Sequence, residues 1–518
     1  MCPPNTTTPY IRPGLGHYVE PDEEDLNLEQ IRVMVSKTKG YYVRDYSLGL
    51  GWNNASPAMR YILEGGVLHA TLLNRTLVFP SFVYARACQW NVTVCGSYAT
   101  MVNRGDAIGS SEWRELPIDQ QMGWRVPIGV MVDFKHLRSR YNVITIREYL
   151  LLHGLDPELE RSNGAWARDA YHTSDPKPSL AVIRNHEYDP SSIVRVDRLP
   201  PVAKEVGGSV VATVLQEALG QNHLMNLDDA RKTLQNKGMN TWSSEEEFHE
   251  LLDSNGFAIL HTFAGAVTEP IQEIAQRSSL RGLVDDYDHY TEEVLLLEGE
   301  VHLYRKPGFL LFTTVEERIR FTDLVLHGFR PIPQIVHVAE RIATRMLAVN
   351  DGRMWMTSHM RRGDFVRFSW AMSNDLHAHL DRIKQRLGVG AQKIRDMVKS
   401  RERWKTADVP NVSADQTFID VEPPRDGDKF YLATDERTPD GLQYIREHGG
   451  VLAMDILTPE DRRLVGWPLL LTDVLAILEQ VVMSHGAYFY AHAMSSVAGG
   501  VVNMRGARGM DPRLTLID

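Results

Sequence analysis

A basic segment in the second half of the chain carries residue types that suit a diphosphate. Residues 358–367 read SHMRRGDFVR, with Arg361 and Arg362 next to each other. They follow an apolar run that predicts a buried strand, and in open α/β sheets ligands bind beyond the carboxyl ends of the strands. Two arginines there can hold a diphosphate through charge-assisted hydrogen bonds and stabilise the charge of a departing diphosphate. A solvated basic loop is the structural alternative.

The same segment contains the tripeptide Arg362-Gly363-Asp364, a sequence that can act as an adhesion ligand. Three-residue matches arise often by chance, and this one adjoins a strand that we expect to be buried. We therefore interpret the tripeptide as an accident of the phosphate-binding segment.

Polar residues also follow other expected strands. A glycine turn at 49–51 leads into Asn53 and Asn54 before a helix, where amides and free N–H groups suit phosphate or sugar hydroxyls. Asp435 ends the strand YLAT, where its carboxylate can accept hydrogen bonds from guanine or ribose. Ser495 and Ser496 open a small-residue helix whose free N–H groups suit phosphate or base. In each case an ordinary turn or helix cap is the alternative.

Two Asp-x-Asp patterns raise the question of a metal. They are Asp286-Tyr287-Asp288 and Asp426-Gly427-Asp428, and many glycosyltransferases bind a divalent metal with this pattern. Both lie in polar loops, and neither follows a convincing buried strand. HExxH and paired CxxC spacings are absent from the sequence, so a zinc site is not expected either. We predict no metal.

Taken in chain order, these segments resemble the GDP-fucose protein O-fucosyltransferases and their plant and fungal relatives. The family's hallmark HxRRxDF corresponds to HMRRGDF at 359–365. An early G-x-N-N turn precedes LLNRTLVFP at 72–80, a strand ending in ATD corresponds to YLATD at 431–435, and a serine-containing segment lies at 491–506. A further similar segment spans 297–308, and the resemblance covers roughly residues 40–95 and 295–510. It implies an inverting, metal-independent enzyme of GT-B fold.

The resemblance implies a role for each matching position. Arg361 would hold the β-phosphate as the principal catalytic group, and Asp435 would read guanine. His359 and Asp364 would shape the phosphate loop and contact ribose or backbone. Some relatives use a glutamate before the early turn as base, and the nearest carboxylate here is Asp45. The remaining residues implied to contact the donor are Asn53, Asn54, Arg362, Ser495, Ser496 and Val497, the last in place of the usual Phe.

Strand and helix patterns alternate around these residues, which implies parallel sheets. Apolar spacing and turn residues predict strands at 41–48, 77–79, 294–297, 309–312, 353–356, 430–433, 451–454 and 488–490, and a strand leading into a helix at 143–152. They predict helices at 57–73, 209–219, 244–255, 315–325, 332–348, 376–405 with an interruption at Gly388 to Gly390, and 469–485.

The predicted fold class is α/β, a GT-B glycosyltransferase with two Rossmann-like parallel-sheet domains facing a cleft. The 518 residues suffice for such domains. We expect an extended arm at 1–28, an acceptor-side domain at 29–335 with a helical elaboration at 155–255, and a GDP-sugar-binding domain at 336–518. The net charge of −11 disfavours nucleic acid as a partner.

Location is judged from targeting signals, cysteines and glycosylation motifs. No uninterrupted apolar stretch of about 18 residues predicts a transmembrane helix, and the N-terminal residues lack signal-peptide character, although an anchor can have been trimmed. Cys88 and Cys95 are spaced for a disulfide, with two buried thiols as the alternative. Together with sequons at Asn5, Asn54, Asn74, Asn91 and Asn411, this favours the secretory lumen, with a cytoplasmic location open.

The function hypothesis is transfer of L-fucose from GDP-fucose to a hydroxyl, Ser or Thr of a protein, with no cofactor beyond the donor. The partners expected are a GDP-sugar and a protein or glycan acceptor. The alternatives are a transferase for another GDP-sugar or a glycan acceptor, a non-catalytic glycan-binding or adhesion protein of the same fold, and a nucleotide-binding regulator.

Overall fold

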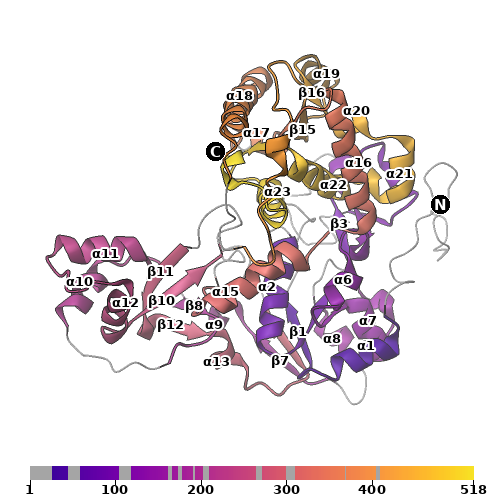
Figure 1. Cartoon of the computed structure of the whole chain (residues 1–518). Coiled ribbons are helices and arrows are strands. Elements are labelled where there is room, and N and C mark those ends of the chain that lie inside the picture. Colours follow the sequence, from indigo (N-terminus) through magenta and orange to yellow (C-terminus); the bar gives the residue numbers. More distant parts are fainter. Residues whose placement is uncertain are drawn as a thin grey trace.

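The computed structural model describes residues 26–44, 59–103, 118–160, 166–172, 178–188, 190, 193–201, 209–263, 271–298, 310–367, 369–403 and 409–518. Figure 1 shows three lobes: an N-terminal lobe in indigo and purple, a projecting magenta lobe, and a C-terminal lobe in orange and yellow. No described helix combines the length and the apolar character needed to cross a bilayer.

The N-terminal lobe is built on a parallel sheet with strand order β6-β2-β1-β13-β7. Side chains of β1 alternate between two cores, Tyr42 on the side of α2 and Val43 on the side of α1 and α7. Both faces are therefore covered, as parallel sheets require, and the predicted β1–α2–β2 unit is confirmed. The bounds are α1 Leu28–Val35, β1 Tyr41–Arg44, α2 Met59–Leu72, β2 Thr76–Phe79, β6 Val143–Thr145, α7 Ile146–Leu152, β7 Leu180–Ile183 and β13 Val294–Leu297.

The projecting lobe combines helices with an antiparallel sheet of order β10-β11-β9 and a parallel pair β12-β8. The predicted helices at 209–219 and 244–255 are confirmed, whereas the sheet was not foreseen. At 309–312 the described residues form isolated bridges, Leu311 with Val196 and Phe312 with His261, instead of the predicted strand. The bounds are β8 Val194–Val196, α10 Val210–Ala218, β9 Met225–Asn226, α11 Leu227–Asn236, α12 Glu245–Ser254, β10 Phe257–Thr262, β11 Ile271–Gln276, β12 Leu280–Gly282 and α13 Leu283–Tyr287.

A small antiparallel sheet of order β3-β5-β4 docks on the C-terminal half. The predicted Cys88–Cys95 disulfide is present in the segment that follows β3. Backbone bonds join this segment to the other half, from Gln89 N to Leu470 O at 2.8 Å and from Thr472 N to Ala87 O at 3.0 Å. The bounds are β3 Phe82–Ala85, α3 Val92–Gly96, β4 Met101–Asn103, α5 Ile118–Gln121, β5 Met122–Pro127, η3 Ile128–Val130 and α6 Phe134–Arg138.

The C-terminal lobe is built on a second parallel sheet, of order β16-β15-β14-β17-β18. Buried side chains of α18 cover one face, and those of α16 and α22 cover the other. Before it enters this lobe, the chain forms α15 Val315–Asp323, which lies beside α2 and contacts β10 (Figure 1), and the π-helix η6 Leu324–Gly328. The bounds in the lobe are α16 Pro333–Val349, β14 Met356–Met360, α17 Gly363–Arg367, α18 Leu376–Ser400, β15 Phe430–Thr434, α19 Pro439–Glu447, β16 Gly450–Val451, α20 Ala453–Ile456, α21 Pro459–Val465, α22 Thr472–His485, β17 Tyr488–Ala491, α23 Ser496–Ala507 and β18 Thr515–Ile517.

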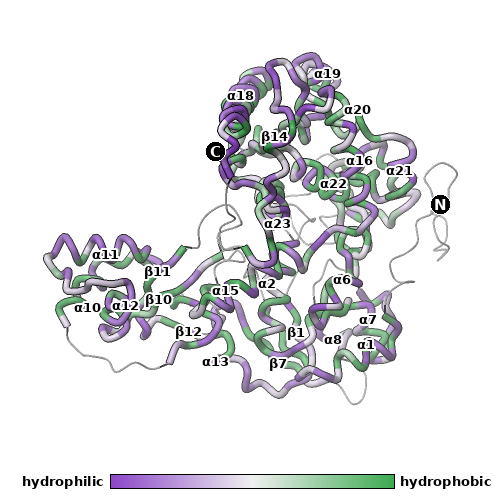
Figure 2. The backbone as a smooth tube through the Cα atoms, in the orientation of Figure 1, coloured by the Kyte–Doolittle hydropathy of each residue, from purple (hydrophilic) through white to green (hydrophobic). Residues whose placement is uncertain are grey.

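Three element predictions in this lobe are wrong. The strand predicted at 353–356 begins later, because β14 spans Met356–Met360 and includes the first residues of the basic segment. The helix α18 continues through its glycines, because Gly390 allows close packing: a Cβ at that position would lie 2.5 Å from the Tyr488 ring. The strand predicted at 451–454 is limited to β16, after which the chain turns into α20. Figure 2 shows hydrophilic and hydrophobic residues alternating along α18, as expected of a helix with one face on a sheet.

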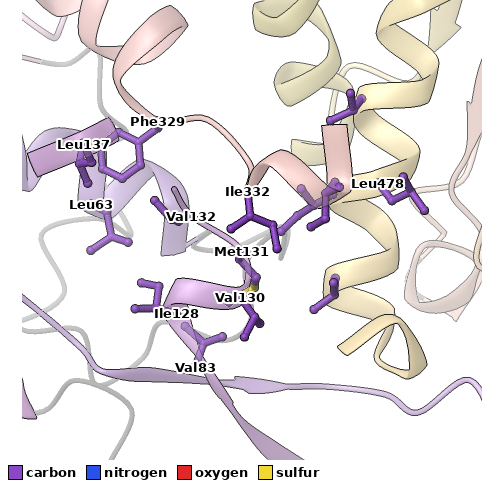
Figure 3. Close-up of a cluster of buried hydrophobic side chains, with 14 of the residues drawn as sticks. Leu63, Val83, Ile128, Val130, Met131, Val132, Leu137, Phe329, Ile332 and Leu478 are labelled. Atoms are coloured by element: carbon purple, nitrogen blue, oxygen red, sulfur yellow. The ribbon is translucent and has the colours of Figure 1, made fainter. Parts of the chain in front are cut away.

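A continuous hydrophobic core connects the two sheet-containing lobes. Ile128, Val130 and Met131 from the N-terminal half belong to the same buried cluster as Ile332 and Leu478. Figure 3 shows these side chains together. The chain thus contains two α/β units that are each built on a five-stranded parallel sheet, in agreement with the predicted α/β class.

Candidate functional site

Strand order identifies where a ligand fits the C-terminal sheet. Numbered along the chain, its strands lie in the order 3-2-1-4-5, so the order reverses between β14 and β17. In open α/β sheets ligands bind at such a switch point, outside the carboxyl ends of the strands. The segments that follow β14, β15 and β17 are the three that the sequence analysis selected in this half, so they meet at one sheet edge.

The first contact across the switch point joins His359 to Ser495. Ser495 Oγ lies 3.2 Å from His359 Nδ1, and the imidazole is buried. Burial lowers the pKa of His359 to about 3, and the nearby positive charge of Arg361 adds to the effect. The imidazole is therefore neutral at pH 7, and the hydrogen bond fixes the start of α23 relative to β14.

Arg361 lies beside an acidic and an aromatic group. Its Nη1 is 2.8 Å from Asp435 Oδ2, and both side chains are about a quarter exposed. Its guanidinium carbon is 5.5 Å from the centroid of the buried Phe365 ring. This arginine thus combines an ion pair with access to solvent.

Arg362 has different surroundings. Its Nε donates to Glu436 Oε2 at 3.0 Å, and its two other nitrogens donate to the carbonyls of Asn374 and Ser373 at 2.9 Å and 3.4 Å. The side chain is buried. The two arginines that the sequence analysis placed together on a diphosphate are therefore separated by the fold, and the buried Arg362 also fits our rejection of the adhesion interpretation.

The start of α23 contacts the N-terminal half. The Tyr61 hydroxyl on α2 donates to the Ser496 carbonyl at 3.2 Å, and a Cβ on Gly499 would lie 2.7 Å from the same hydroxyl. The carbonyl of Val497 accepts a hydrogen bond from Gln480 Nε2 at 3.4 Å. Sequence reasoning missed Tyr61, because it lies beside the apolar stripe that was used to identify α2.

Several proposed residues cannot be placed with the others. Asp45, Asn53 and Asn54 lie outside the described residues, as do the glycine turn at 49–51 and the predicted end of the first strand. The backbone of Asp364 lies in α17, but its side chain is outside the described part of the structure.

The Asp-x-Asp carboxylates pair with basic side chains. Asp286 lies 2.6 Å from Arg195 Nη1, and Asp288 lies 2.6 Å from Lys39 Nζ. The second pattern pairs in the same way, Asp428 with Arg353 at 2.7 Å and Asp426 with Arg395 at 3.6 Å. Within the described residues, no group of three or more His, Cys, Asp or Glu side chains is arranged to hold a metal ion.

No family model and no curated protein sequence matches this chain. Among solved structures, the chain is similar to POFUT1 in complex with GDP-fucose, with 10% sequence identity, coverage of 93% of this chain and 98% of that chain, and a TM-score of 0.36. A second crystal form of that complex gives 10% identity, 92% and 98% coverage and a TM-score of 0.37. POFUT1 in complex with GDP gives 10% identity, 92% and 98% coverage and a TM-score of 0.36.

Proposed function

We propose that this chain is a glycosyltransferase that transfers L-fucose from GDP-fucose to a hydroxyl, Ser or Thr of a protein, with inversion and without a metal. The observation that carries the proposal is the meeting of three separate sequence segments at the switch point of the C-terminal sheet. Arg361 pairs with Asp435 there at 2.8 Å, and His359 bonds Ser495 at 3.2 Å. A partly exposed arginine at this strand end suits an anionic diphosphate.

In this proposal Arg361 is the principal catalytic residue. The acceptor oxygen forms a bond to the anomeric carbon of fucose while the bond from that carbon to the β-phosphate oxygen breaks. GDP departs with the bonding electron pair, and Arg361 stabilises the charge that grows on its β-phosphate. The acceptor proton passes to a base, for which Asp45 remains our candidate.

The other proposed donor contacts come from both halves of the chain. His359 and Asp364 shape the phosphate loop, while Ser495, Ser496 and Val497 close on base and phosphate from the start of α23. Asn53 and Asn54, which lie outside the described residues, stay our candidates for contacts with the diphosphate and fucose. Arg362 contributes by holding the loop that carries Arg361, since its own side chain bonds Glu436. The Cys88–Cys95 disulfide is typical of an oxidising compartment and supports a lumenal location.

The decisive experiment measures GDP affinity and GDP-fucose turnover for the wild type and for Arg361→Ala. Loss of a preorganised charge donor should lower kcat by roughly 10²–10³-fold. Arg437→Ala is the matched control, because Arg437 is an exposed arginine two residues from Asp435. Unchanged binding and turnover in Arg361→Ala would overturn the proposal.

Two further measurements separate the alternatives. Competition with GDP-mannose tests the identity of the sugar, since a fucosyltransferase should bind GDP-fucose more tightly. GDP binding without GDP release from GDP-fucose, across a panel of peptide and glycan acceptors, would favour a non-catalytic protein of this fold.

A further inference from the structure

We propose that Asn91 carries an N-linked glycan, and that this glycan covers the exposed apolar side chains of Trp90 and Val94. The site lies on the surface of the segment that the disulfide between Cys88 and Cys95 closes. The modification is separate from the proposed transfer reaction. It requires that the chain passes through the secretory lumen, but it involves no residue of the donor site.

The side chain of Asn91 is held in a turn that uses only its amide oxygen. Asn91 Oδ1 accepts a hydrogen bond from the Thr93 backbone N–H at 3.0 Å and another from the Thr93 hydroxyl at 2.9 Å. This is an Asx turn, in which the asparagine caps the helix α3 that follows. Within the described residues no hydrogen bond occupies Asn91 Nδ2, the atom that a sugar would be attached to. Asn91 and Thr93 are both exposed, so the two side chains of the sequon are accessible to an enzyme.

The disulfide fixes this turn at the surface. Cys88 and Cys95 are buried, and they flank the sequon on its two sides. The backbone before the sequon is bound to the C-terminal half, from Gln89 N to Leu470 O at 2.8 Å. Because both ends of the segment are held, a bulky group on Asn91 can extend into solvent without displacing it. Disulfides persist in oxidising compartments such as the ER lumen, where N-linked glycans are also attached.

Two large apolar side chains next to Asn91 are exposed. Trp90 is 53% exposed and Val94 is 39% exposed. Trp90 immediately precedes the asparagine, and Val94 lies in the first turn of α3. The first sugar of an N-linked glycan is N-acetylglucosamine, and the C–H groups on the face of its ring pack well against an indole. Neighbouring exposed apolar groups favour a covering partner, and a glycan on the residue between them is the occupant that this site fits.

The sequon at Asn411 provides a comparison within the same chain. Asn411 Nδ2 donates a hydrogen bond to Asp323 Oδ1 at 3.0 Å, so the atom that would carry a sugar links its loop to the end of α15. A glycan at this position would displace that bond. The two sequons therefore have the same residue pattern, but Asn91 is bonded through its oxygen and Asn411 through its nitrogen.

The modification is a group transfer from a lipid-linked oligosaccharide pyrophosphate. Asn91 Nδ2 forms a bond to the anomeric carbon of the first sugar, while the bond from that carbon to a phosphate oxygen of the donor breaks. The pyrophosphate departs with the bonding electron pair, and a base of the transferring enzyme accepts one amide proton. The product keeps Oδ1 as an acceptor, so the two bonds from Thr93 can remain.

Peptide mass spectrometry on the full chain, isolated from the cells that make it, measures occupancy at each sequon. Peptide N-glycosidase in water labelled with heavy oxygen converts a glycosylated asparagine into a labelled aspartate. We expect the label in the peptide that contains Asn91 and no label at Asn411. An unlabelled Asn91 peptide overturns the inference, whether or not Asn411 is labelled.

Variants of the full chain, secreted from a eukaryotic cell, test the sequon itself. Thr93→Ala should remove the label from the Asn91 peptide, whereas Thr93→Ser, which keeps the hydroxyl, should retain it. Asn411→Gln is the matched control and should leave labelling at Asn91 unchanged. Persistent labelling of the Asn91 peptide in Thr93→Ala would contradict an N-linked glycan at this sequon. GDP binding should be the same in Thr93→Ala and in the wild type, so this result is independent of the proposed function.

An apolar fluorescent dye tests whether the glycan covers Trp90 and Val94. Enzymatic removal of glycans from the folded wild type should increase dye fluorescence, because the two side chains become accessible. The double variant Trp90→Thr, Val94→Thr should show a smaller increase after the same treatment. Equal increases in the two proteins, or no increase in the wild type, would contradict the proposed covering.

Discussion

Arginines lie at both ends of the C-terminal sheet, but their surroundings differ between the two ends. At the amino end, Arg353 binds both oxygens of Asp428, from Nε at 2.9 Å and from Nη2 at 2.7 Å. Arg505, fully buried at the same end, donates to the carbonyls of Gly486, Ala487 and Leu514 and to the Thr515 hydroxyl. At the carboxyl end, Arg361 pairs with a carboxylate that is about a quarter exposed.

This comparison indicates that Arg353 and Arg505 stabilise the fold, whereas Arg361 can exchange its partner for a ligand. A buried guanidinium with several bound donors cannot leave without stranding the groups it satisfies. A partly exposed ion pair contributes little stability, because water can replace either partner. Arg362 lies at the carboxyl end but resembles the amino-end arginines, so the double arginine of the motif contains one residue of each kind.

The largest expected effect is at the amino end. Arg505→Met should lower the free energy of unfolding by about 3–5 kcal/mol, because it strands three carbonyls at a buried site. Urea denaturation followed by circular dichroism measures the loss, and Arg463→Met, at an exposed arginine on α21, should change stability by no more than about 0.5 kcal/mol. Equal losses in the two variants would contradict the assignment of Arg505 to the fold.

The next test compares the two adjacent arginines of the motif. Arg362→Met should lower the unfolding free energy by about 2–3 kcal/mol, since it removes the donor to Glu436 Oε2 and to two carbonyls. Arg361→Met should lower it by less than about 1 kcal/mol and yet reduce turnover far more. Stability and turnover are measured on the same preparations of both variants. Equal stability losses would contradict the assignment of Arg362, but not Arg361, to the fold.

The sequence could predict the parallel sheets and most strand ends, because alternation of apolar strands and helices directly reflects burial on both faces. Placement of Arg361, Asp435 and Ser495 at strand ends follows from the same pattern. The different surroundings of Arg361 and Arg362 could not be predicted, since the residues are identical and adjacent. Only the register between β14 and β15 determines which one meets Glu436.

Tyr61 and Gly390 illustrate a second limit. Each is explained by a residue more than 90 positions away, Ser496 in one case and Tyr488 in the other. Glycine in a long helical pattern predicts an interruption, and only the approach of Tyr488 shows why α18 continues. Local patterns carry no information about such partners.

A pH titration extends the comparison to two histidines, His359 at the carboxyl end of the sheet and His485 at its amino end. Burial lowers the pKa of both His359 and His485 to about 3, below the value of 6.5 for an exposed histidine. Below pH 6.5 the unfolded chain takes up a proton that the folded chain refuses, so stability falls as pH drops toward 3. His359→Asn should remove about 1.4 kcal/mol per pH unit from that slope.

His485→Asn should flatten the same slope, which is measured by urea denaturation between pH 4 and pH 6.5. Only His359→Asn should also weaken GDP binding at pH 7, because only this histidine bonds Ser495 at the start of α23. An unchanged slope in both variants would mean that the folded and unfolded chains protonate alike. Weaker GDP binding in His485→Asn would contradict the difference between the two ends.

The smallest expected effect concerns the contact between the carboxyl end and the N-terminal half. Tyr61→Phe removes the hydrogen bond to the Ser496 carbonyl and should lower stability by about 1 kcal/mol. Gly499→Ala places a methyl group 2.7 Å from the Tyr61 hydroxyl, and overpacking of this kind costs about 1–3 kcal/mol. Because Tyr61→Phe removes that hydroxyl, the double variant should lose less than the sum of the single losses. If the loss in the double variant instead equals the sum of the two single losses, the two residues are not in contact.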